Sequence, residues 1–272
     1  MTREHDDPPS APQPKFERPF VAPCRSLSPG APLRWLGLGW RDFIAARGVS
    51  LAYGLAVFAV SALVSFAAWK LGRWVLLITV LSGFIFVAPL LAFALYSVSR
   101  QLCEGRTPSL SHTLRAMRRP VSNAMVFALV LLVVFLVWAR AGSMVHVFFP
   151  VDAHPNPRQV VMFLAIGSAV GSIFALITFA ATAFSLPMLA NRDVDVVTAV
   201  VSSVNAVLRN KPTMAVWVAL IVALTGVGFA TALLGLVVVI PWLAYATWHG
   251  YRETLDVSHW PILAHPDAAR AD

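Results

Sequence analysis

Apolar residues in this chain form long runs separated by short polar segments. Four runs cover residues 49–69, 74–98, 121–138 and 160–188, and a fifth lies between residues 211 and 249. The hydrocarbon core of a bilayer is about 30 Å thick, and a helix needs about 20 apolar residues to cross it. Each of the first four runs therefore predicts one membrane-spanning helix.

The fifth run is too long for one span. At 1.5 Å per residue it would reach roughly 55 Å, nearly twice the thickness of the bilayer core. It predicts two helices joined by a tight turn, which we place near residues 226–231. The predicted fold is an all-α, polytopic membrane protein with six transmembrane helices.

A four-residue pattern, Pro-x-Leu-Ala, occurs three times and begins at Pro89, Pro187 and Pro241. Each copy lies near the end of an even-numbered predicted span, and each odd-numbered span follows a short amphipathic pattern. The chain therefore predicts three parallel repeats of an amphipathic helix plus a helical hairpin, at about 33–100, 108–192 and 195–252. Because every repeat starts on the same side of the membrane, a pseudo-threefold axis along the membrane normal is the natural arrangement.

The amphipathic patterns place apolar residues at three- and four-residue steps, which predicts helices lying in the cytoplasmic interface. The third is the longest, and its apolar face contains Val197, Val200, Val201, Val204, Val207 and Leu208. The first contains Leu36, Trp40, Phe43 and Ile44 with Arg34, Arg41 and Arg47, and the second contains Leu110, Leu114 and Met117.

The three prolines each delete one helix hydrogen bond, which predicts a kink near the cytoplasmic end of the span. The kinks could open a shared vestibule, but proline is frequent in membrane helices and improved packing is the simpler interpretation. Gly167 and Gly171 form a Gly-xxx-Gly pair, which predicts close packing against another helix.

Composition and charge agree with a membrane setting. The chain has 58% hydrophobic and 12% charged residues, too little polar surface for a soluble globule of 272 residues. All but four of its 21 lysines and arginines fall on the side that holds the N-terminus, the exceptions being Lys70, Arg73, Arg140 and Arg158. The positive-inside rule then predicts that both termini are cytoplasmic.

The net charge of +8 is spread over the loops that would face an anionic leaflet. Attraction to anionic headgroups explains it without a nucleic-acid partner. Residues 1–32 are polar and rich in proline and predict a disordered cytoplasmic tail, and residues 256–272 predict a second, C-terminal one. The first tail has no short apolar segment of the kind found in signal peptides.

Candidate chemistry is sparse. No charged residue or histidine lies in the middle of a predicted span, which argues against an ion pump or a proton-driven transporter. Cysteine and histidine spacings match no metal or haem site, so we predict neither a metal nor a cofactor. The nucleophile, metalloprotease and phosphate-loop motifs are also missing, so the sequence predicts that the protein is not an enzyme.

The densest set of chemically capable side chains lies where the sixth predicted helix meets the cytoplasm: Trp248, His249, Tyr251 and Arg252. Arg252 and His249 could bind a headgroup phosphate or contact a partner. The simpler interpretation is an interfacial aromatic anchor with a cytoplasmic arginine.

Two motifs carry a resemblance to a known family. They are Asn191-Arg192-Asp193-Val194-Asp195 and the stretch from Pro241 through Ala246-Thr247-Trp248-His249 to Tyr251-Arg252. Over roughly residues 35–255 the chain resembles a bacterial family of predicted integral membrane proteins catalogued as domain of unknown function 2189. The resemblance implies a multi-pass protein of the bacterial inner membrane and implies no particular activity.

Three functions follow as hypotheses. The first is a non-catalytic interaction or scaffold protein that binds lipid or a partner through its amphipathic helices. The alternative is a small-solute transporter or channel built around the pseudo-threefold axis. The third is a membrane enzyme that acts on a lipid headgroup near His249 and Arg252.

Overall fold

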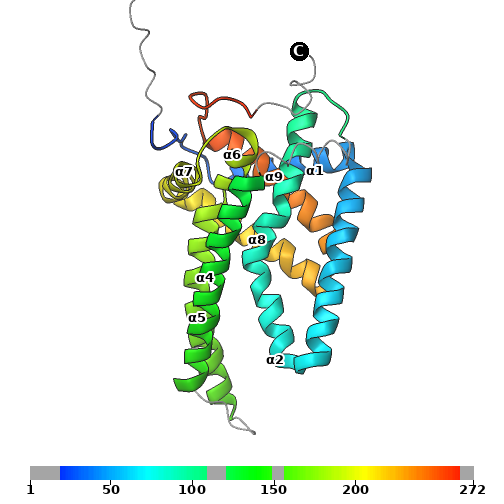
Figure 1. The fold of residues 1–272 in the computed structure, drawn as a ribbon, viewed down its shortest axis with the longest axis vertical. Helices are drawn as coiled ribbons and strands as arrows, with labels where there is room; N and C mark the ends of the chain where they lie inside the picture. The colour runs from blue at the N-terminus through cyan, green and yellow to red at the C-terminus, as the bar shows by residue number, and fades with distance from the viewer. Residues whose placement is uncertain (1–18, 109–120, 149–155, 264–272) are drawn as a thin grey trace, which may run out of the picture.

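The computed structural model describes residues 19–108, 121–148 and 156–263, and it confirms the all-α class (Figure 1). The helices are α1 (Ala31–Ala45), α2 (Arg47–Cys103), α4 (Val121–Phe148), α5 (Pro157–Thr182), α6 (Ser185–Asn191), α7 (Val196–Arg209), α8 (Lys211–Ala230) and α9 (Leu236–Thr254). The amphipathic pattern predicted around Leu110, Leu114 and Met117 lies outside the described residues.

The first two predicted spans are the two arms of α2, which turns back on itself at the end far from α1 (Figure 1). The segments Arg47–Leu71 and Gly83–Cys103 are each long and apolar enough to cross a membrane. The Tyr53 hydroxyl of the first arm donates to the Leu91 carbonyl of the second at 2.6 Å. This hydrogen bond fixes the antiparallel alignment of the two arms.

The third and fourth predicted spans are α4 and the α5–α6 pair, which run side by side (Figure 1). Their candidate membrane segments are Met125–Gly142 and Ala165–Asn191. They contact α2 through aromatic side chains: the Phe86 ring lies 5.5 Å from the rings of both Phe135 and Trp138. The interior of the spanning region is therefore held mainly by van der Waals contact.

The last two helices differ from the prediction. Among the described residues five helices are long and apolar enough to cross a membrane; α8 is one of them, whereas α9 is not. The structure establishes neither six spans nor three repeats. The turn also lies later than predicted, at residues 231–235, because the glycines of this region allow close packing within the hairpin. A Cβ on Gly228 would lie 2.3 Å from the Leu236 side chain.

One end of the molecule is a hydrogen-bonded layer made of α1, α6, α7, the second half of α9, and the segments 19–30 and 255–263. We call it the interface layer. Ala22 N donates to Ser202 Oγ at 2.9 Å, and Arg25 N donates to the Thr254 carbonyl at 2.8 Å. Residues 19–30, which composition placed in a disordered tail, are thus bound to α7 and α9, and both ends of the described chain lie in this layer.

The centre of the interface layer is Trp35 of α1, which is fully buried. Its ring packs edge-on against Trp217 of α8 at 5.6 Å and Phe184 at 6.4 Å, and its Nε1 donates to Glu253 at 2.8 Å. The same ring lies where a Cβ on Gly250 would be, at 2.9 Å. One side chain therefore joins α1 to α8, α9 and the start of α6.

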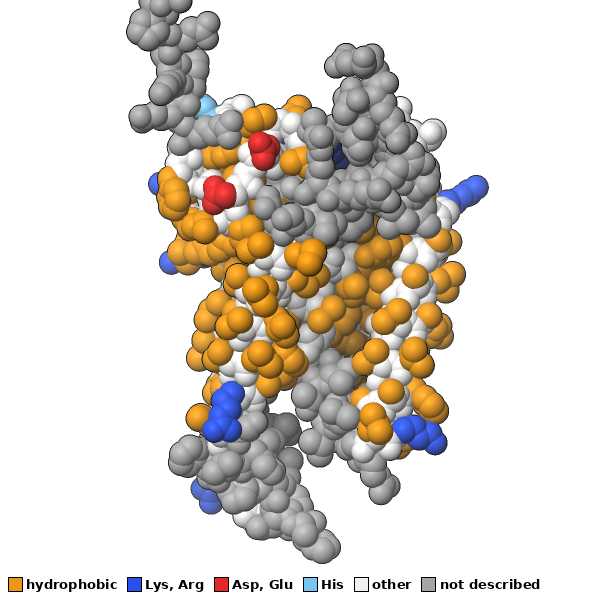
Figure 2. Space-filling view, in the orientation of Figure 1, with side chains coloured by type: hydrophobic (Ala, Val, Ile, Leu, Met, Phe, Trp, Pro, Cys, Tyr) orange, Lys and Arg blue, Asp and Glu red, His pale blue; other side chains and the backbone are white. Residues whose placement is uncertain are grey.

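Below the interface layer, large apolar side chains face outward. Leu63 is 68% exposed and Leu129 is 61% exposed. Figure 2 shows hydrophobic side chains covering a broad band of this face, with Lys and Arg at its far end. An apolar surface of this extent is typical of contact with lipid rather than water, and it supports a multi-pass integral membrane protein.

Candidate functional site

Three polar side chains from three helices meet at the junction of α1, α2 and α9. Asp42 Oδ2 accepts a hydrogen bond from Ser99 Oγ at 2.7 Å and lies 2.9 Å from His249 Nε2. Ser99 is fully buried, and the side chains of Asp42 and His249 are only 14% and 16% exposed. We call these residues the Asp42 cluster.

Two separate polar contacts follow the cluster along α2 toward the membrane. The hydroxyls of Ser50 and Tyr245 lie 2.8 Å apart, and Tyr53 donates to the Leu91 carbonyl. Tyr245 precedes His249 by four residues and so lies on the same face of α9, one turn deeper. The contact between α2 and α9 is therefore polar over its first turns and apolar beyond them.

One carboxylate joins the three helices of the Asp42 cluster. Asp42 Oδ2 accepts from Ser99 Oγ and lies within hydrogen-bond distance of His249 Nε2. The Ser99 hydroxyl is bonded to the carboxylate, whereas in a Ser-His-Asp triad the serine is bonded to the histidine. These contacts connect α1 to both α2 and α9.

The residues predicted around His249 do not converge on one point. Trp248 is buried against Tyr251, with ring centroids 5.6 Å apart, and its Nε1 has no hydrogen-bond partner among the described residues. The Tyr251 hydroxyl accepts from Asn191 Nδ2 at 2.9 Å. Arg252 is exposed on another face of α9. The structure thus brings His249 together with Asp42 and Ser99 instead of with Arg252.

The three prolines have different surroundings. Pro89 and Pro241 lie within continuous helices, whereas Pro187 lies in the short helix α6, which is separated from α5 by a break at Ala183 and Phe184. Proline cannot donate to the carbonyl four residues earlier and its ring crowds that group. For Pro187 this carbonyl belongs to Ala183, which explains the position of the break.

Pro241 leaves the Val237 carbonyl without its helix donor, and this carbonyl faces Gly54 of α2. A Cβ built on Gly54 would lie 2.0 Å from the Val237 oxygen. The two helices can approach this closely only because residue 54 is glycine. A glycine on α2 and a proline on α9 thus define one close helix contact.

Gly167 and Gly171 of α5 make little contact within the chain. No described atom lies within 4 Å of a Cβ added to Gly167, and only Trp138 Nε1, at 3.9 Å, approaches one on Gly171. The Gly-xxx-Gly pair therefore places one glycine against α4 and leaves the other beside open space.

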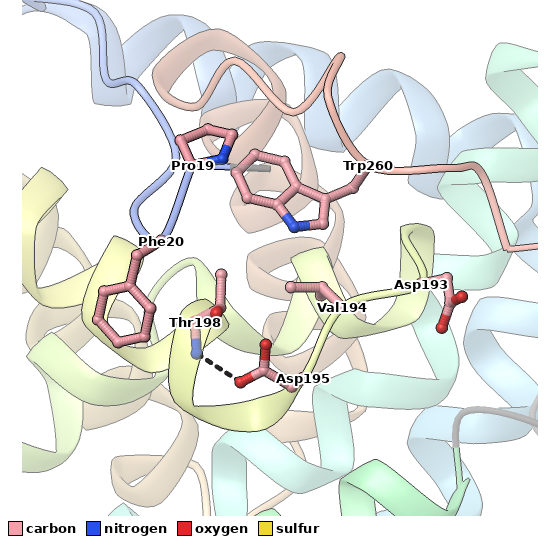
Figure 3. A pocket seen from close by; sticks show the side chains of 7 residues that line it. All are labelled: Pro19, Phe20, Asp193, Val194, Asp195, Thr198 and Trp260. Carbon is pink, nitrogen blue, oxygen red and sulfur yellow. Dashed lines mark hydrogen bonds between the residues drawn. The ribbon is translucent and has the colours of Figure 1, made fainter. Parts of the chain in front are cut away.

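The first resemblance motif lies at the start of α7, beside a cleft of about 530 Å³ in the interface layer (Figure 3). The cleft is lined by Pro19, Phe20, Asp193, Val194, Asp195, Thr198 and Trp260. Asp195 caps α7 by accepting from Thr198 N at 2.8 Å. Although partial burial opposes ionisation, the hydrogen bonds from Thr198 hold the pKa of Asp195 below its ordinary value.

The described residues contain no group of three or more His, Cys, Asp or Glu side chains that could hold a metal ion. Both carboxylates of the cleft are exposed, and they differ in role because Asp195 caps α7 and Asp193 does not. The Asp193 backbone N–H donates to the Pro261 carbonyl at 3.0 Å. The motif therefore joins the start of α7 to the C-terminal segment.

Sequence reasoning missed Asp42 and Ser99. Asp42 is an acidic residue on a helix whose other charges are arginines, and this was the only local signal. Its partners come from distant helices, and the sequence alone does not show that α1 crosses α9.

Comparison with known proteins gives one match. Residues 76–191 match the model of a family described as "Predicted integral membrane protein (DUF2189)". This confirms the resemblance noted from the sequence, over a shorter region that runs from within α2 to the end of α6. It includes Asn191 but neither the rest of that motif nor the stretch from Pro241 to Arg252. No curated protein and no solved structure matches the chain.

Proposed function

We propose that this chain is a non-catalytic interaction protein of a bacterial inner membrane, and that its interface layer faces the cytoplasm and binds anionic headgroups. The observation that carries the proposal is the orientation of α7. This helix buries Thr198, Ala199, Ser202, Ser203 and Ala206, and it leaves Val197 and Leu208 exposed and Val201 and Val204 partly exposed. A helix with its small and polar face inward fits a surrounding of lipid.

Basic residues flank the outward apolar side chains of both amphipathic helices. Along α1, Trp40 and Ile44 are exposed next to Arg41 and Arg47. Arg209 and Lys211 are exposed at the end of α7 beside Leu208. Apolar side chains that enter the interface together with cations are typical of binding to an anionic leaflet.

The Asp42 cluster supports a structural role, since Asp42 accepts from Ser99 and contacts His249 and so connects α1 to α2 and α9. Arg34 and Glu253 also pair across α1 and α9. These contacts fix the amphipathic helix α1 to the spanning helices. We infer that the layer is a rigid platform for lipid or for a protein partner that approaches along the membrane surface.

Lipid selection tests the proposal. The purified protein is placed in nanodiscs that contain a mixture of phosphatidylglycerol and phosphatidylcholine, and the lipids retained after mild delipidation are identified by native mass spectrometry. We expect enrichment of phosphatidylglycerol. Each juxtamembrane cation contributes about 1 kcal/mol to such binding, so the combined variant R41Q/R47Q/R209Q/K211Q should lose most of the enrichment.

A matched control removes a cation from the same end of the molecule but not from α1 or α7. Arg106 is exposed beyond the end of α2, with its guanidinium 3.6 Å from Glu104. The variant R106Q should keep the enrichment. Equal retention of both lipids by the unmodified protein would refute the proposal.

The alternative function is a small-solute pathway, and the observation that favours it is that Tyr245 and Tyr53 make polar contacts between the helices on the membrane side of the Asp42 cluster. Polar side chains aligned toward the membrane interior are common along transport pathways. Solute uptake by proteoliposomes would support this alternative if the variant Tyr245→Phe changed the rate.

A further inference from the structure

The hairpin of α8 and α9 begins and ends in the interface layer. At its start, Thr213 Oγ1 lies 3.2 Å from the carbonyls of both Leu27 and Ser28. At its end, Glu253 accepts from Trp35 Nε1. The two ends of the hairpin are therefore on the same side of the membrane.

The hairpin does not reach the opposite side. Val237, the second residue of α9, lies against Gly54 near the start of the first arm of α2. That arm continues from Gly54 to Leu71, about 25 Å further at 1.5 Å per residue. Figure 1 shows the turn between α8 and α9 well short of the point where α2 turns back.

A second contact gives the depth independently. Phe229, one residue before the end of α8, packs edge-on against Phe84, with ring centroids 5.4 Å apart. The two arms are hydrogen-bonded between Tyr53 and Leu91, so Phe84, seven residues before Leu91, lies about 10 Å further from the interface layer at 1.5 Å per residue. The tip of the hairpin thus lies between the levels of Gly54 and Phe84, within the hydrocarbon core.

The turn itself is built to exclude water. The backbone N–H groups from Thr231 to Val238 all donate within the hairpin, to carbonyls or to Thr231 Oγ1. Thr231 Oγ1 in turn lies 3.0 Å from the carbonyls of Val227 and Gly228. Hydrocarbon offers no hydrogen bonds, so a turn at membrane depth must satisfy its own donors. A loop in water has no such requirement.

Two further features fit this surrounding. The outward side chains at the tip are apolar: Leu234 is 58% exposed and Val227 is 57% exposed. Ala232 and Leu233 adopt positive φ angles of 52° and 71°, which residues other than glycine rarely do. The closed set of hydrogen bonds holds this tight conformation without a glycine at either position.

We propose that α8 and α9 form a re-entrant hairpin, and that this one-sided insertion makes the protein favour membranes that are convex on the side of the interface layer. A helix with its side chains is about 10–12 Å wide, so two helices add roughly 160–230 Å² of cross-section to one leaflet only. The helix α7, on which Val197 and Leu208 are exposed, adds further area to the same leaflet. Inserted apolar helices of this kind are sensitive to curvature.

Cysteine labelling tests the position of the tip. In full-length protein with C24S and C103S, single cysteines are introduced as Ala232→Cys or Leu234→Cys, and proteoliposomes are treated with a membrane-impermeant maleimide from either side. We expect neither variant to react until the membrane is dissolved in SDS. The control Lys70→Cys should react from the far side, and the control Arg252→Cys from the side of the interface layer.

Two labelling outcomes would overturn the proposal. Reaction of Ala232→Cys or Leu234→Cys from the far side would show that the hairpin spans the membrane. Reaction from the side of the interface layer would place the tip in water. Two tip positions are used so that a folding defect in one variant leaves the other informative.

Sorting by vesicle size tests the consequence for membrane shape. The fluorescently labelled protein is reconstituted at low density in phosphatidylcholine vesicles of mixed size, which removes the charge attraction on which the proposed function rests. Copies with the interface layer outside should be several-fold denser in small vesicles than in large ones. Copies with the layer inside should show the opposite trend, and orientation is read from Arg252→Cys accessibility. Equal density at all sizes, or the same trend for both orientations, would overturn the proposal.

Discussion

The interface layer and the spanning arms are held together in different ways. In the layer, Trp35 and Tyr251 are fully buried, and hydrogen bonds join the terminal segments to α7 and α9. Along the spans, few residues are buried within the chain: 17% of those in the apolar stretch of Arg47–Leu71, and 11% of those in Met125–Gly142. The layer is therefore specified by contacts between particular side chains, whereas the positions of these spans depend on the bilayer.

This difference has a physical origin. Lipid tails are as apolar as leucine, so burying an apolar side chain between spanning helices gains little over leaving it in lipid. In the interface layer water competes for every polar group, and burial of large aromatic side chains is strongly favourable there. Substitutions should therefore act on stability mainly through the layer.

The largest effect is expected at Trp35. The variant Trp35→Ala removes the side chain that packs on Trp217 and Phe184 and leaves a cavity between three helices, at a cost of about 3–5 kcal/mol. The measurement is the free energy of unfolding from SDS titration in mixed micelles. The matched change Leu63→Ala, at a lipid-facing position that is 68% exposed, should shift it by less than about 0.5 kcal/mol. Equal effects would contradict the distinction between the two regions.

The next effect is expected where the two regions meet, at Gly54. A methyl group there would lie 2.0 Å from the Val237 carbonyl, so Gly54→Ala forces α9 away from α2 and should cost about 1–3 kcal/mol or more. The control is Gly48→Ala on the same helix, where no described atom lies within 4 Å of the new Cβ. Because alanine favours helix, this control should be neutral or stabilising by up to about 1 kcal/mol. Thermal unfolding midpoints in detergent compare the two, and equal losses would refute the close contact.

A double-mutant cycle sharpens the comparison at the Asp42 cluster. Asp42→Ala and His249→Ala should show a coupling energy of about 1–2 kcal/mol, because their hydrogen bond is largely shielded from water. The pair of Glu104 and Arg106, with side chains 33% and 51% exposed, should couple by less than about 0.5 kcal/mol. If both cycles gave the smaller coupling energy, the contact between Asp42 and His249 would not stabilise the packing of α1 against α9.

The sequence predicted the parts of the fold that the bilayer sets. The two arms of α2 and the helices α4 and α5 follow from the lengths of the apolar runs, because the thickness of the core fixes how many residues a span needs. The amphipathic helix α7 follows from the three- and four-residue spacing of its apolar residues. These features depend on local pattern alone, and no distant partner is required to recognise them.

The interface layer could not be predicted in the same way. Asp42, Ser99 and His249 are far apart in sequence, and the sequence draws attention to His249 without indicating its partners. The predicted turn near residues 226–231 is too early, because α8 continues to Ala230 and Gly228 within it provides room for Leu236. A glycine near the end of a helix can end the helix or make room for a neighbouring side chain, and only the packing partner distinguishes the two roles.

The smallest expected effect concerns a helix cap in the interface layer. Asp195→Ala removes the acceptor for Thr198 N and should cost about 1 kcal/mol, whereas Asp193→Ala, whose carboxylate does not cap α7, should be near neutral. Because the pKa of folded Asp195 lies below its ordinary value, its contribution is present at neutral pH and is lost as the pH falls through the folded pKa. The difference in unfolding free energy between Asp195→Ala and the unmodified protein should therefore narrow in strong acid. A constant difference from neutral to strongly acidic pH would show that the lost stability does not come from the carboxylate, and would assign it to packing in the cleft instead.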